Sequence, residues 1–510
     1  MKFIISYWEN HPLRCIILLA LFFRTLSVIF SKGYGMHDDH FLVLEAAQAW
    51  VDNSSNNNWL PWNNPDPKPS GHSFFYVGMH FLILYFLKWI GFTGPQGKMY
   101  IVRLLHALFS LLTVFLTYRI TLKISDKKTA NRVGLLHAVL WFMPFLSVRN
   151  LVEVVCIPFM LFSLWKLMNT DRKKYLWQVF VAGFIIGLGV SVRFQVIFFA
   201  CGAGLVFLLK KQIKECIIYG SGLFLSLVAI QGTVDFLMWG RPFAELTEYI
   251  RYNLEGENKV FAGHWYQYML LLGGILLPPV SIFILAGYFL SFRKHLIIFL
   301  PALVFIVFHS YFPNKQERFI LPVVPFVLIA GMCGWNEFIS GSAFWKKRKK
   351  IISACWVIFW TINTILLLVI SVTYTKKSMV ESMSYLSKYV NINSIVSENT
   401  NDNSYRMLPL YYLGQWPAIH YITQTNTADD FKPYLEDLRA AKRPLPDFIL
   451  FFDTAGLVRR IQNMKILFPG IQHEKTIHPG FIDDLMRRLN PNNKNYTVVI
   501  YSTNEGSQKN

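Results

Sequence analysis

Residues 13–45 read LRCIILLALFFRTLSVIFSKGYGMHDDHFLVLE, an apolar stretch followed closely by two aspartates between two histidines. The apolar part, 13–31, approaches the ~20 residues that a helix needs to cross the hydrocarbon core of a bilayer. No small-residue cleavage pattern follows it, so we expect the segment to stay in the membrane. Asp38 and Asp39 then lie at a membrane surface, where carboxylates stay hydrated and can meet a ligand.

The whole composition is that of a polytopic membrane protein. Hydrophobic residues make up 53% of the 510 residues, more than in an ordinary soluble domain. The net charge is +20, but the basic residues come in short runs between apolar segments, which is typical of cytoplasmic loops and argues against a nucleic-acid partner. The six cysteines lie in or beside apolar segments without metal-site spacing, so we expect no disulfide framework and no zinc site.

Eleven apolar segments are predicted to span the membrane, with the N-terminus inside and the C-terminus outside. They are 13–31, 103–123, 133–149, 151–168, 176–192, 194–209, 216–238, 268–291, 295–310, 319–335 and 351–374. A further stretch, 74–92, is predicted to be an interfacial helix within an outer loop from about residue 32 to 102. Only that placement leaves all five basic clusters in the cytoplasm; the clusters lie at 123–132, 172–174, 210–214, 293–294 and 346–350.

Beyond residue 376 the apolar segments stop, and a soluble α/β domain is predicted over 376–510 on the periplasmic or lumenal side of a catalytic membrane domain, 1–375. Helical stretches alternate there with short runs of β-branched and aromatic residues. The helical stretches are 378–390, 428–441 and 456–467, and the β-type runs are 418–422, 448–452 and 498–501. No phosphate-binding glycine loop is present in this sequence.

This topology brings most of the polar residues that interrupt apolar sequence to the outer face. They are Asp38, Asp39, Glu45, Arg103, Arg149, Asn150, Glu153, Arg193, Asp235, Asn253, His264, Lys315 and Arg318. Ionisable groups near membrane depth are costly and usually mark a site, so we predict one shared outer cavity. Arg24, midway along the first span, is expected to be a structural partner of an internal acid.

Each of these residues also has an ordinary interpretation. The acid pair could be a solvated cap of the first span, and any one cation could be an interfacial anchor whose charge reaches water. His37, His40 and the later Glu45 favour a functional pair, because a carboxylate near cationic groups can be held ionised as a general base. Five cations on the same side favour a phosphate or pyrophosphate leaving group.

Residues 37–45, HDDHFLVLE, resemble the first-loop pattern Asp-Glu-x-Phe-x-x-x-Glu of glycosyltransferase family 22. This family comprises GT-C mannosyltransferases that use dolichyl-phosphate-mannose in N-glycan and GPI-anchor assembly. Residues 149–153, RNLVE, resemble a shortened form of its Arg-Thr-x-x-Asn-x-x-Glu stretch, and Arg193 is similar to its Arg-Pro turn.

The resemblance continues in order to about residue 340. Residues 235–240 with Asn253, and residues 261–266, FAGHWY, are similar to the family's Asp-x-x-x-Tyr-Gly and Tyr-Gly-x-His-Pro-Trp motifs. The most specific match is 310–319, SYFPNKQERF, which resembles Ser-x-x-Pro-His-Lys-Glu-x-Arg-Phe. The chain departs from the family at three positions: Asp39 replaces Glu, Asn314 replaces His and Gln316 replaces Glu.

The resemblance implies a GT-C membrane enzyme that moves a hexose, with mannose expected, from a polyprenyl-phosphate carrier to an acceptor hydroxyl with inversion. Asp38 would be the general base, Asp39 and Glu45 would orient the acceptor or the base, and the basic residues would stabilise charge on the departing phosphate. The lipid-phosphate-linked sugar is the donor substrate, and neither a metal nor another cofactor is expected. The acceptor would be a glycan, lipid or protein.

Two other classes remain open. Another GT-C activity, such as protein O-glycosylation or lipid headgroup glycosylation, would have the same residues. A secondary transporter of an anionic lipid or sugar phosphate would be expected to show inverted repeats and helix breaks at the membrane midplane, which are not evident here. The lack of cysteines in 376–510 favours a bacterial inner membrane over the endoplasmic reticulum.

Overall fold

The computed structural model describes residues 2–54, 60–63, 67–168, 174–255, 263–425, 427–441, 443, 445–490 and 493–503. The chain forms two compact units, each built from separate stretches of sequence. The first unit comprises Met1–Ile29, Leu60–Met79 and Val102–Val372, and the second comprises Phe30–Trp59, His80–Ile101 and Thr373–Asn510. The second unit therefore contains most of the predicted outer loop as well as the C-terminal region.

Helices make up nearly all regular structure before residue 372. Those of the first half are α1 Lys2–Asn10, α2 Pro12–Phe30, a π-helix Asp39–Glu45, α3 Ala46–Asp52, a 3-10 turn Pro61–Asn63, α4 Phe74–Trp89, α5 Pro95–Ile124, α6 Lys127–Val139, α7 Met143–Ser147, α8 Val152–Val155, α9 Ile157–Leu167 and α10 Tyr175–Val192. The others are α11 Val196–Leu209, α12 Ile213–Leu227, a π-helix Val228–Gly232, α13 Thr233–Trp239, α14 Ala244–Leu254, α15 Gln267–Ile275, α16 Val280–Leu290, α17 Leu296–Tyr311, a 3-10 helix Glu317–Val323, α18 Val324–Gly341, α19 Ala343–Lys347 and α20 Lys349–Ser371.

Within the described residues, six helical segments are long and apolar enough to cross a membrane. They are Pro12–Phe30, Pro95–Ile124, Tyr175–Val192, Ile213–Trp239, Glu317–Gly341 and Lys349–Ser371, and each overlaps one predicted span. Three other predicted spans, 133–149, 151–168 and 268–291, are each divided into two shorter helices. Pro144, Pro158 and the pair Pro278–Pro279 lie at or just after these breaks, where proline cannot donate the hydrogen bond that would continue the preceding helix. The count of eleven spans stays a prediction.

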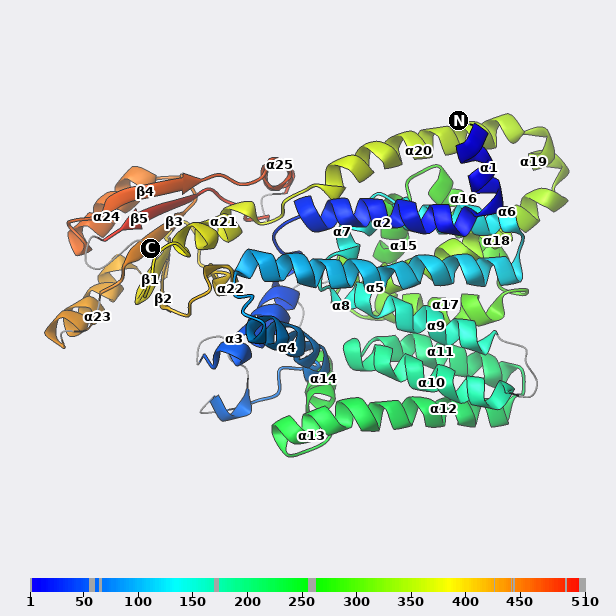
Figure 1. Ribbon diagram of the computed structural model, residues 1–510, viewed down its shortest axis with the longest axis horizontal. Helices are drawn as coiled ribbons and strands as arrows, with labels where there is room; N and C mark the ends of the chain where they lie inside the picture. The colour runs from blue at the N-terminus through cyan, green and yellow to red at the C-terminus, as the bar shows by residue number, and fades with distance from the viewer. Residues whose placement is uncertain are drawn as a thin grey trace. The chain divides into compact units, whose positions relative to one another are not determined.

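Helices of the first unit approach one another closely where they carry glycine. α10 and α12 pack side by side (Figure 1). A Cβ atom added to Gly183 would lie 2.0 Å from the carbonyl oxygen of Tyr219, and one added to Gly222 would lie 2.2 Å from that of Phe180. Small residues at such crossings allow the backbone contact that stabilises helix pairs in lipid.

Arg24 has a structural role, but its partners are not the acid that the sequence suggested. The side chain is fully buried in α2. Its Nε donates to Ser110 Oγ at 2.8 Å, and one Nη donates to the carbonyl oxygen of Ala138 at 3.1 Å. The expectation of an internal acidic partner is therefore wrong, because neutral oxygens from α5 and α6 accept these hydrogen bonds.

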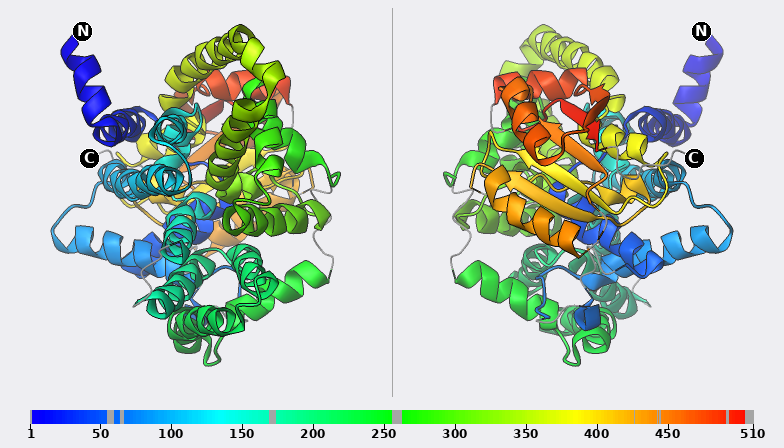
Figure 2. Two further views of the ribbon diagram at one scale, coloured as in Figure 1. Left: turned by 90° about the vertical axis from the view of Figure 1, so that its right-hand side faces the viewer. Right: turned by 90° about the vertical axis from the view of Figure 1, so that its left-hand side faces the viewer.

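The second unit contains a five-stranded sheet of order β2-β1-β3-β5-β4. The right-hand view of Figure 2 shows part of this sheet and the helices beside it in yellow to red. The strands are β1 Ser394–Asn399, β2 Ala418–Thr423, β3 Phe448–Phe452, β4 Gln472–Ile477 and β5 Val498–Ser502, and the helices are α21 Lys377–Leu386, α22 Leu410–Leu413, α23 Ala428–Ala440, α24 Leu457–Leu467 and α25 Phe481–Leu489. β1 pairs in parallel with β2 and β3, whereas β5 is antiparallel to β3 and β4. The three predicted β-type runs are therefore strands β2, β3 and β5.

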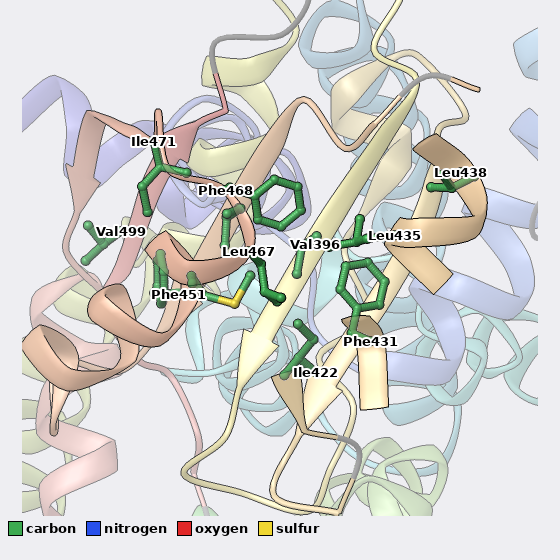
Figure 3. Packing of buried hydrophobic residues seen from close by; sticks show 12 residues of the cluster. Val396, Ile422, Phe431, Leu435, Leu438, Phe451, Leu467, Phe468, Ile471 and Val499 are labelled. Carbon is green, nitrogen blue, oxygen red and sulfur yellow. The ribbon is translucent and has the colours of Figure 1, made fainter. Parts of the chain in front are cut away.

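Apolar side chains bury one face of this sheet against α23 and α24 (Figure 3). Val396, Ile422 and Phe451 from the strands meet Leu435 and Leu467 from the two helices. Strand β3 is buried along its whole length, as expected for a central strand covered on both faces. This core holds the sheet and its two covering helices together.

Candidate active site

The first-loop acid pair begins a π-helix, Asp39–Glu45, which continues directly into α3. π-Helical segments are rare in proteins, and those that do occur often lie at functional sites. Asp38 stands at the N-cap position of this helix, where its side chain is 42% exposed, while Asp39 is almost fully buried. The two adjacent carboxylates thus differ in access to solvent, since consecutive side chains on a helix point in different directions.

His40 lies at the centre of a buried aromatic and acidic group. Its ring stacks on Tyr34, with centroids 4.3 Å apart, and on Tyr412, with centroids 5.5 Å apart. Its Nε2 lies 3.5 Å from Glu45 Oε2, and the same oxygen accepts a hydrogen bond from the Tyr411 backbone N–H at 3.1 Å. Burial, with the nearby charges of Tyr412 and Glu45, raises the pKa of Tyr34. We call these five residues the His40 cluster.

The His40 cluster fixes the segment that carries Asp38. Glu45, His40 and Tyr412 are nearly or completely buried, so Glu45 supports the segment from inside the second unit. Nearer the surface, His37 Nδ1 lies 3.8 Å from Asp38 Oδ1. Asp38 is therefore the member of the acid pair whose carboxylate can reach an incoming hydroxyl group.

In the first unit, Glu153 brings two of the predicted cations together. Arg193 Nη1 donates to Glu153 Oε1 at 2.6 Å, and Arg318 Nε lies 3.4 Å from the same oxygen. Both guanidinium groups also lie over the ring of Phe319, at 5.0 and 5.7 Å from its centroid. Arg318 Nε further donates to Gln316 at 2.8 Å. Two positive charges share one carboxylate, so this Glu153 cluster has a net charge of about +1 before a ligand binds.

Lys315 has different hydrogen-bond partners from Arg193 and Arg318 of the Glu153 cluster. Its Nζ donates to the carbonyl oxygens of His309, Ser310 and Phe312, at 3.2, 2.8 and 2.5 Å. These carbonyls belong to the end of α17, where a cation satisfies unpaired acceptors and offsets the helix dipole. All three of its N–H groups are thereby occupied, so the structure gives Lys315 a capping role.

The other predicted residues are distributed along the first unit. Arg103, Arg149 and Asn150 are buried, and the Arg149 guanidinium lies 4.5 Å from the centroid of the Phe145 ring. Two more residues interact within their own segments. Asn253 donates to the Tyr249 carbonyl at 2.7 Å, and the exposed His264 stacks on Tyr266 with centroids 5.1 Å apart. Residues 172, 173, 261 and 262, which the sequence also singled out, lie outside the described residues.

Asp235 is paired with a second carboxylate that sequence reasoning missed. Asp235 Oδ2 accepts from the backbone N–H of Glu245 at 3.0 Å and so holds the start of α14. The buried Glu245 accepts from the Gly71 backbone N–H at 2.7 Å, from Ser70 Oγ at 3.2 Å and from Trp239 Nε1 at 2.9 Å. Burial raises the pKa of Glu245 to about 7, against the lowering effect of the Gly71 hydrogen bond. In the sequence, Glu245 could have been found only from its position just after the turn 240–242.

Two groups of predicted residues thus come together, each inside one unit. Asp38, Asp39 and Glu45 belong to the second unit, whereas Glu153, Arg193 and Arg318 belong to the first. Sequence reasoning missed the tyrosines of the His40 cluster, although Tyr34 lies only four residues before Asp38 and 410–413, LYYL, is an aromatic run in the tail. The single outer cavity expected for both groups stays a prediction.

Residues 15–416 match the Alg9-like mannosyltransferase family. The chain belongs to this family. The match extends beyond the residue 340 reached by the motif resemblance and includes the tyrosines of the His40 cluster.

Two relatives agree with this assignment. GPI mannosyltransferase 4 of Emericella nidulans is 22% identical over 67% of this chain and 64% of its own length. Mannosyltransferase APTG1 of Arabidopsis thaliana is 23% identical over 65% of this chain and 60% of its own length. The chain thus spans less than two thirds of the length of either relative.

Solved structures show which fold the chain has. The chain resembles ArnT from Cupriavidus metallidurans bound to undecaprenyl phosphate, with a TM-score of 0.63, 11% identity and coverage of 96% of this chain and 97% of ArnT. It also resembles the Archaeoglobus fulgidus oligosaccharyltransferase, with a TM-score of 0.50 and 11% identity. This match covers 86% of this chain and 67% of the oligosaccharyltransferase. At such low identity the likeness shows the fold alone, a GT-C membrane fold.

Proposed function

We propose that this protein is a membrane mannosyltransferase that transfers mannose from a polyprenyl-phosphate-linked donor to an acceptor hydroxyl at the outer membrane face. The observation that carries the proposal is the partly exposed Asp38 on a segment held by the buried His40 cluster. Family membership supports mannose as the sugar. A polyprenyl phosphate donor is supported by the bound lipid of ArnT, which has the same fold.

In the proposed reaction, Asp38 takes the proton from the acceptor hydroxyl as its oxygen attacks the anomeric carbon. The bond between that carbon and the phosphate oxygen breaks, and the polyprenyl phosphate leaves with the bonding electrons. A single displacement of this kind inverts the anomeric centre. The buried Asp39 orients the segment, and we assign Arg193 and Arg318 to the phosphate, because preformed guanidinium groups stabilise charge as it develops.

A transfer assay with the Asp38→Asn variant tests this assignment. Purified protein in lipid nanodiscs receives synthetic polyprenyl-phosphate-mannose with a labelled sugar and a panel of acceptors. We expect turnover to fall roughly 100-fold or more in Asp38→Asn, the usual loss for a general base. Asp39→Asn is the matched control and should lose less activity. Wild-type turnover in Asp38→Asn would remove Asp38 from the reaction, and no transfer by the wild type to any acceptor would count against the proposed activity.

The outer-face location is tested by cysteine labelling. Single cysteines at Ser125 and Ser404, in a variant without the six native cysteines, are treated with a membrane-impermeant thiol reagent on intact vesicles of known orientation. We expect labelling from outside at position 404 and not at position 125, because the basic cluster at 123–132 favours the cytoplasm. The reverse pattern would place the C-terminal region inside. The lack of cysteines in 376–510 leads us to propose a bacterial inner membrane, with a periplasmic outer face.

A further inference from the structure

A cavity of about 320 Å³ lies in the second unit, apart from the residues assigned to the reaction. Its walls come from α3, from the end of α4, from the start of α5 and from residues 410–416. Small-molecule sites range from about 300 to 1,000 Å³, so this cavity has room for one small ring but not for a lipid chain or a long oligosaccharide.

A chain of polar side chains crosses the wall of this cavity. Lys98 Nζ donates to Gln48 Oε1 at 3.1 Å, and Gln48 Nε2 donates to Asp52 Oδ2 at 2.9 Å. Asp52 also accepts from Trp416 Nε1 and from Lys88 Nζ, each at 3.2 Å. Every one of these five residues lines the cavity. Their hydrogen bonds to one another fix the donors and acceptors before a ligand arrives.

Lys98 is the residue whose hydrogen bonding indicates a ligand site. Its side chain is 95% buried, with 5% exposed, yet it uses one of its three N–H groups on Gln48. Among the described residues, no other acceptor within hydrogen-bond distance is recorded for its ammonium group. A buried ammonium with N–H groups to spare is costly unless water or a ligand accepts from it, so Lys98 presents donors to whatever occupies the cavity.

The lining chemistry favours a sugar over a simple anion. The carboxylate of Asp52 accepts hydrogen bonds and repels anions, while Lys88 and Lys98 donate. Sugar hydroxyls both donate and accept, so they can satisfy both kinds of group. Apolar walls, which include Pro95 and Leu410, suit the C–H face of a pyranose ring.

The cavity is also connected to the segment that carries the acid pair. Tyr411 lines the cavity, its backbone N–H donates to Glu45 and its hydroxyl donates to the Pro95 carbonyl at 3.3 Å. Gln48 lies nine residues beyond Asp39 on one continuous helical stretch that begins as the π-helix, so the two residues are on the order of 10 Å apart along its axis. A ring held beside Gln48 is therefore not in contact with the acid pair.

We propose that this cavity binds one hexose ring of the acceptor glycan, other than the ring that receives the transferred sugar. The inference rests on the proposed function for the identity of its ligand. Lys98, Gln48 and Asp52 are positioning residues in this scheme. Binding energy from such a remote part of the substrate holds the reacting hydroxyl in place.

Saturation-transfer NMR on the full-length protein in nanodiscs tests this proposal with methyl α-D-mannopyranoside as the probe. We expect signal in the wild type and in Asp38→Asn, and roughly tenfold weaker binding in Lys98→Met, the order expected for losing a charged hydrogen bond. Lys465→Met, the same change at an exposed position of α24, is the control and should bind as the wild type does. Equal binding by Lys98→Met and Lys465→Met would overturn the proposal.

A second measurement needs no variant, in case Lys98→Met fails to fold. Amine labelling of the wild type, read by mass spectrometry, should slow at the half-exposed Lys88 when the mannoside is present and stay unchanged at Lys465. Protection of Lys88 by inorganic phosphate but not by the mannoside would assign the cavity to an anion and overturn the sugar proposal. Sugar binding without any transferase activity would contradict the proposed function but not the proposed sugar site. Transferase activity without Lys98-dependent sugar binding would contradict the proposed sugar site but not the proposed function.

Discussion

Glu153 in the first unit and Glu45 in the second are both fully buried carboxylates, but the two units stabilise them differently. Glu153 lies between the guanidinium groups of Arg193 and Arg318. Glu45 has a histidine ring and a backbone N–H as its neighbours instead. The Glu153 cluster is therefore charged and suited to binding an anionic group, whereas the His40 cluster mainly fixes the conformation of the first-loop segment.

The largest effect should come from neutralising these two carboxylates. Glu153→Gln removes the negative charge between two buried guanidinium groups and should cost about 3–5 kcal/mol of unfolding free energy, as breaking buried ion pairs does. Glu45→Gln keeps an oxygen that can accept from Tyr411 and should cost about 1 kcal/mol. Unfolding in mixed micelles with added SDS measures the unfolding free energy of both variants and of the wild type.

The control for this comparison is Glu248→Gln. Glu248 forms an exposed pair with Arg251 three residues later, so its loss should change stability by less than about 1 kcal/mol. Equal losses for Glu153→Gln and Glu45→Gln would show that the two clusters are not electrostatically distinct.

Glu245 extends the comparison, because this third buried carboxylate has no cationic partner in its hydrogen bonds and burial raises its pKa. Its pKa is raised from an ordinary value near 4.5 to about 7 in the folded protein, chiefly by burial. The folded state therefore binds more protons than the unfolded state between these pH values, and stability should fall as pH rises through that window. The whole change is at most ~3 kcal/mol, from 1.36 kcal/mol per pKa unit.

Unfolding measured from pH 4.5 to 8 in the wild type and in Glu245→Gln tests this linkage. The variant should lose the part of the pH dependence that Glu245 contributes, whereas Glu248→Gln should keep it. An unchanged pH profile in Glu245→Gln would mean that Glu245 is ionised in the folded protein throughout this range.

A smaller effect should separate Lys315 from Arg318, two cations that lie close together in the sequence. Lys315→Met loses three hydrogen bonds to carbonyls at the end of α17 and should cost about 1–2 kcal/mol of stability, with little change in donor use. Arg318→Ala should instead raise the donor concentration needed for half-maximal transfer. A larger donor effect in Lys315→Met than in Arg318→Ala would return Lys315 to the phosphate site.

Much of the fold followed from local patterns in the sequence. Apolar length located the six long spans, since each needs only ~20 consecutive residues to be recognised. Three strands of the sheet were recognisable from their β-branched and aromatic runs. The motif around Asp38, together with 310–319, was enough to indicate the family that residues 15–416 then matched.

Other parts of the site could not be predicted, because they depend on where side chains point. Asp38 and Asp39 are neighbours of the same type, and only the course of the π-helix makes one exposed and the other buried. The sequence predicts Lys315 as a phosphate ligand, and only the structure shows that its N–H groups donate to carbonyls at the end of α17.

By itself, the sequence determined the membrane class, the family motifs and the acid pair, because hydropathy and short spacings are local properties of the chain. Only the tertiary structure joined Glu45 to Tyr411 and Asp52 to Trp416. These contacts connect residues more than 360 positions apart, and a hydrogen bond at that separation leaves no periodic pattern in a single sequence. The grouping of 30–59 and 80–101 with the C-terminal region, and the cavity that they enclose, was decided by the packing of the folded chain.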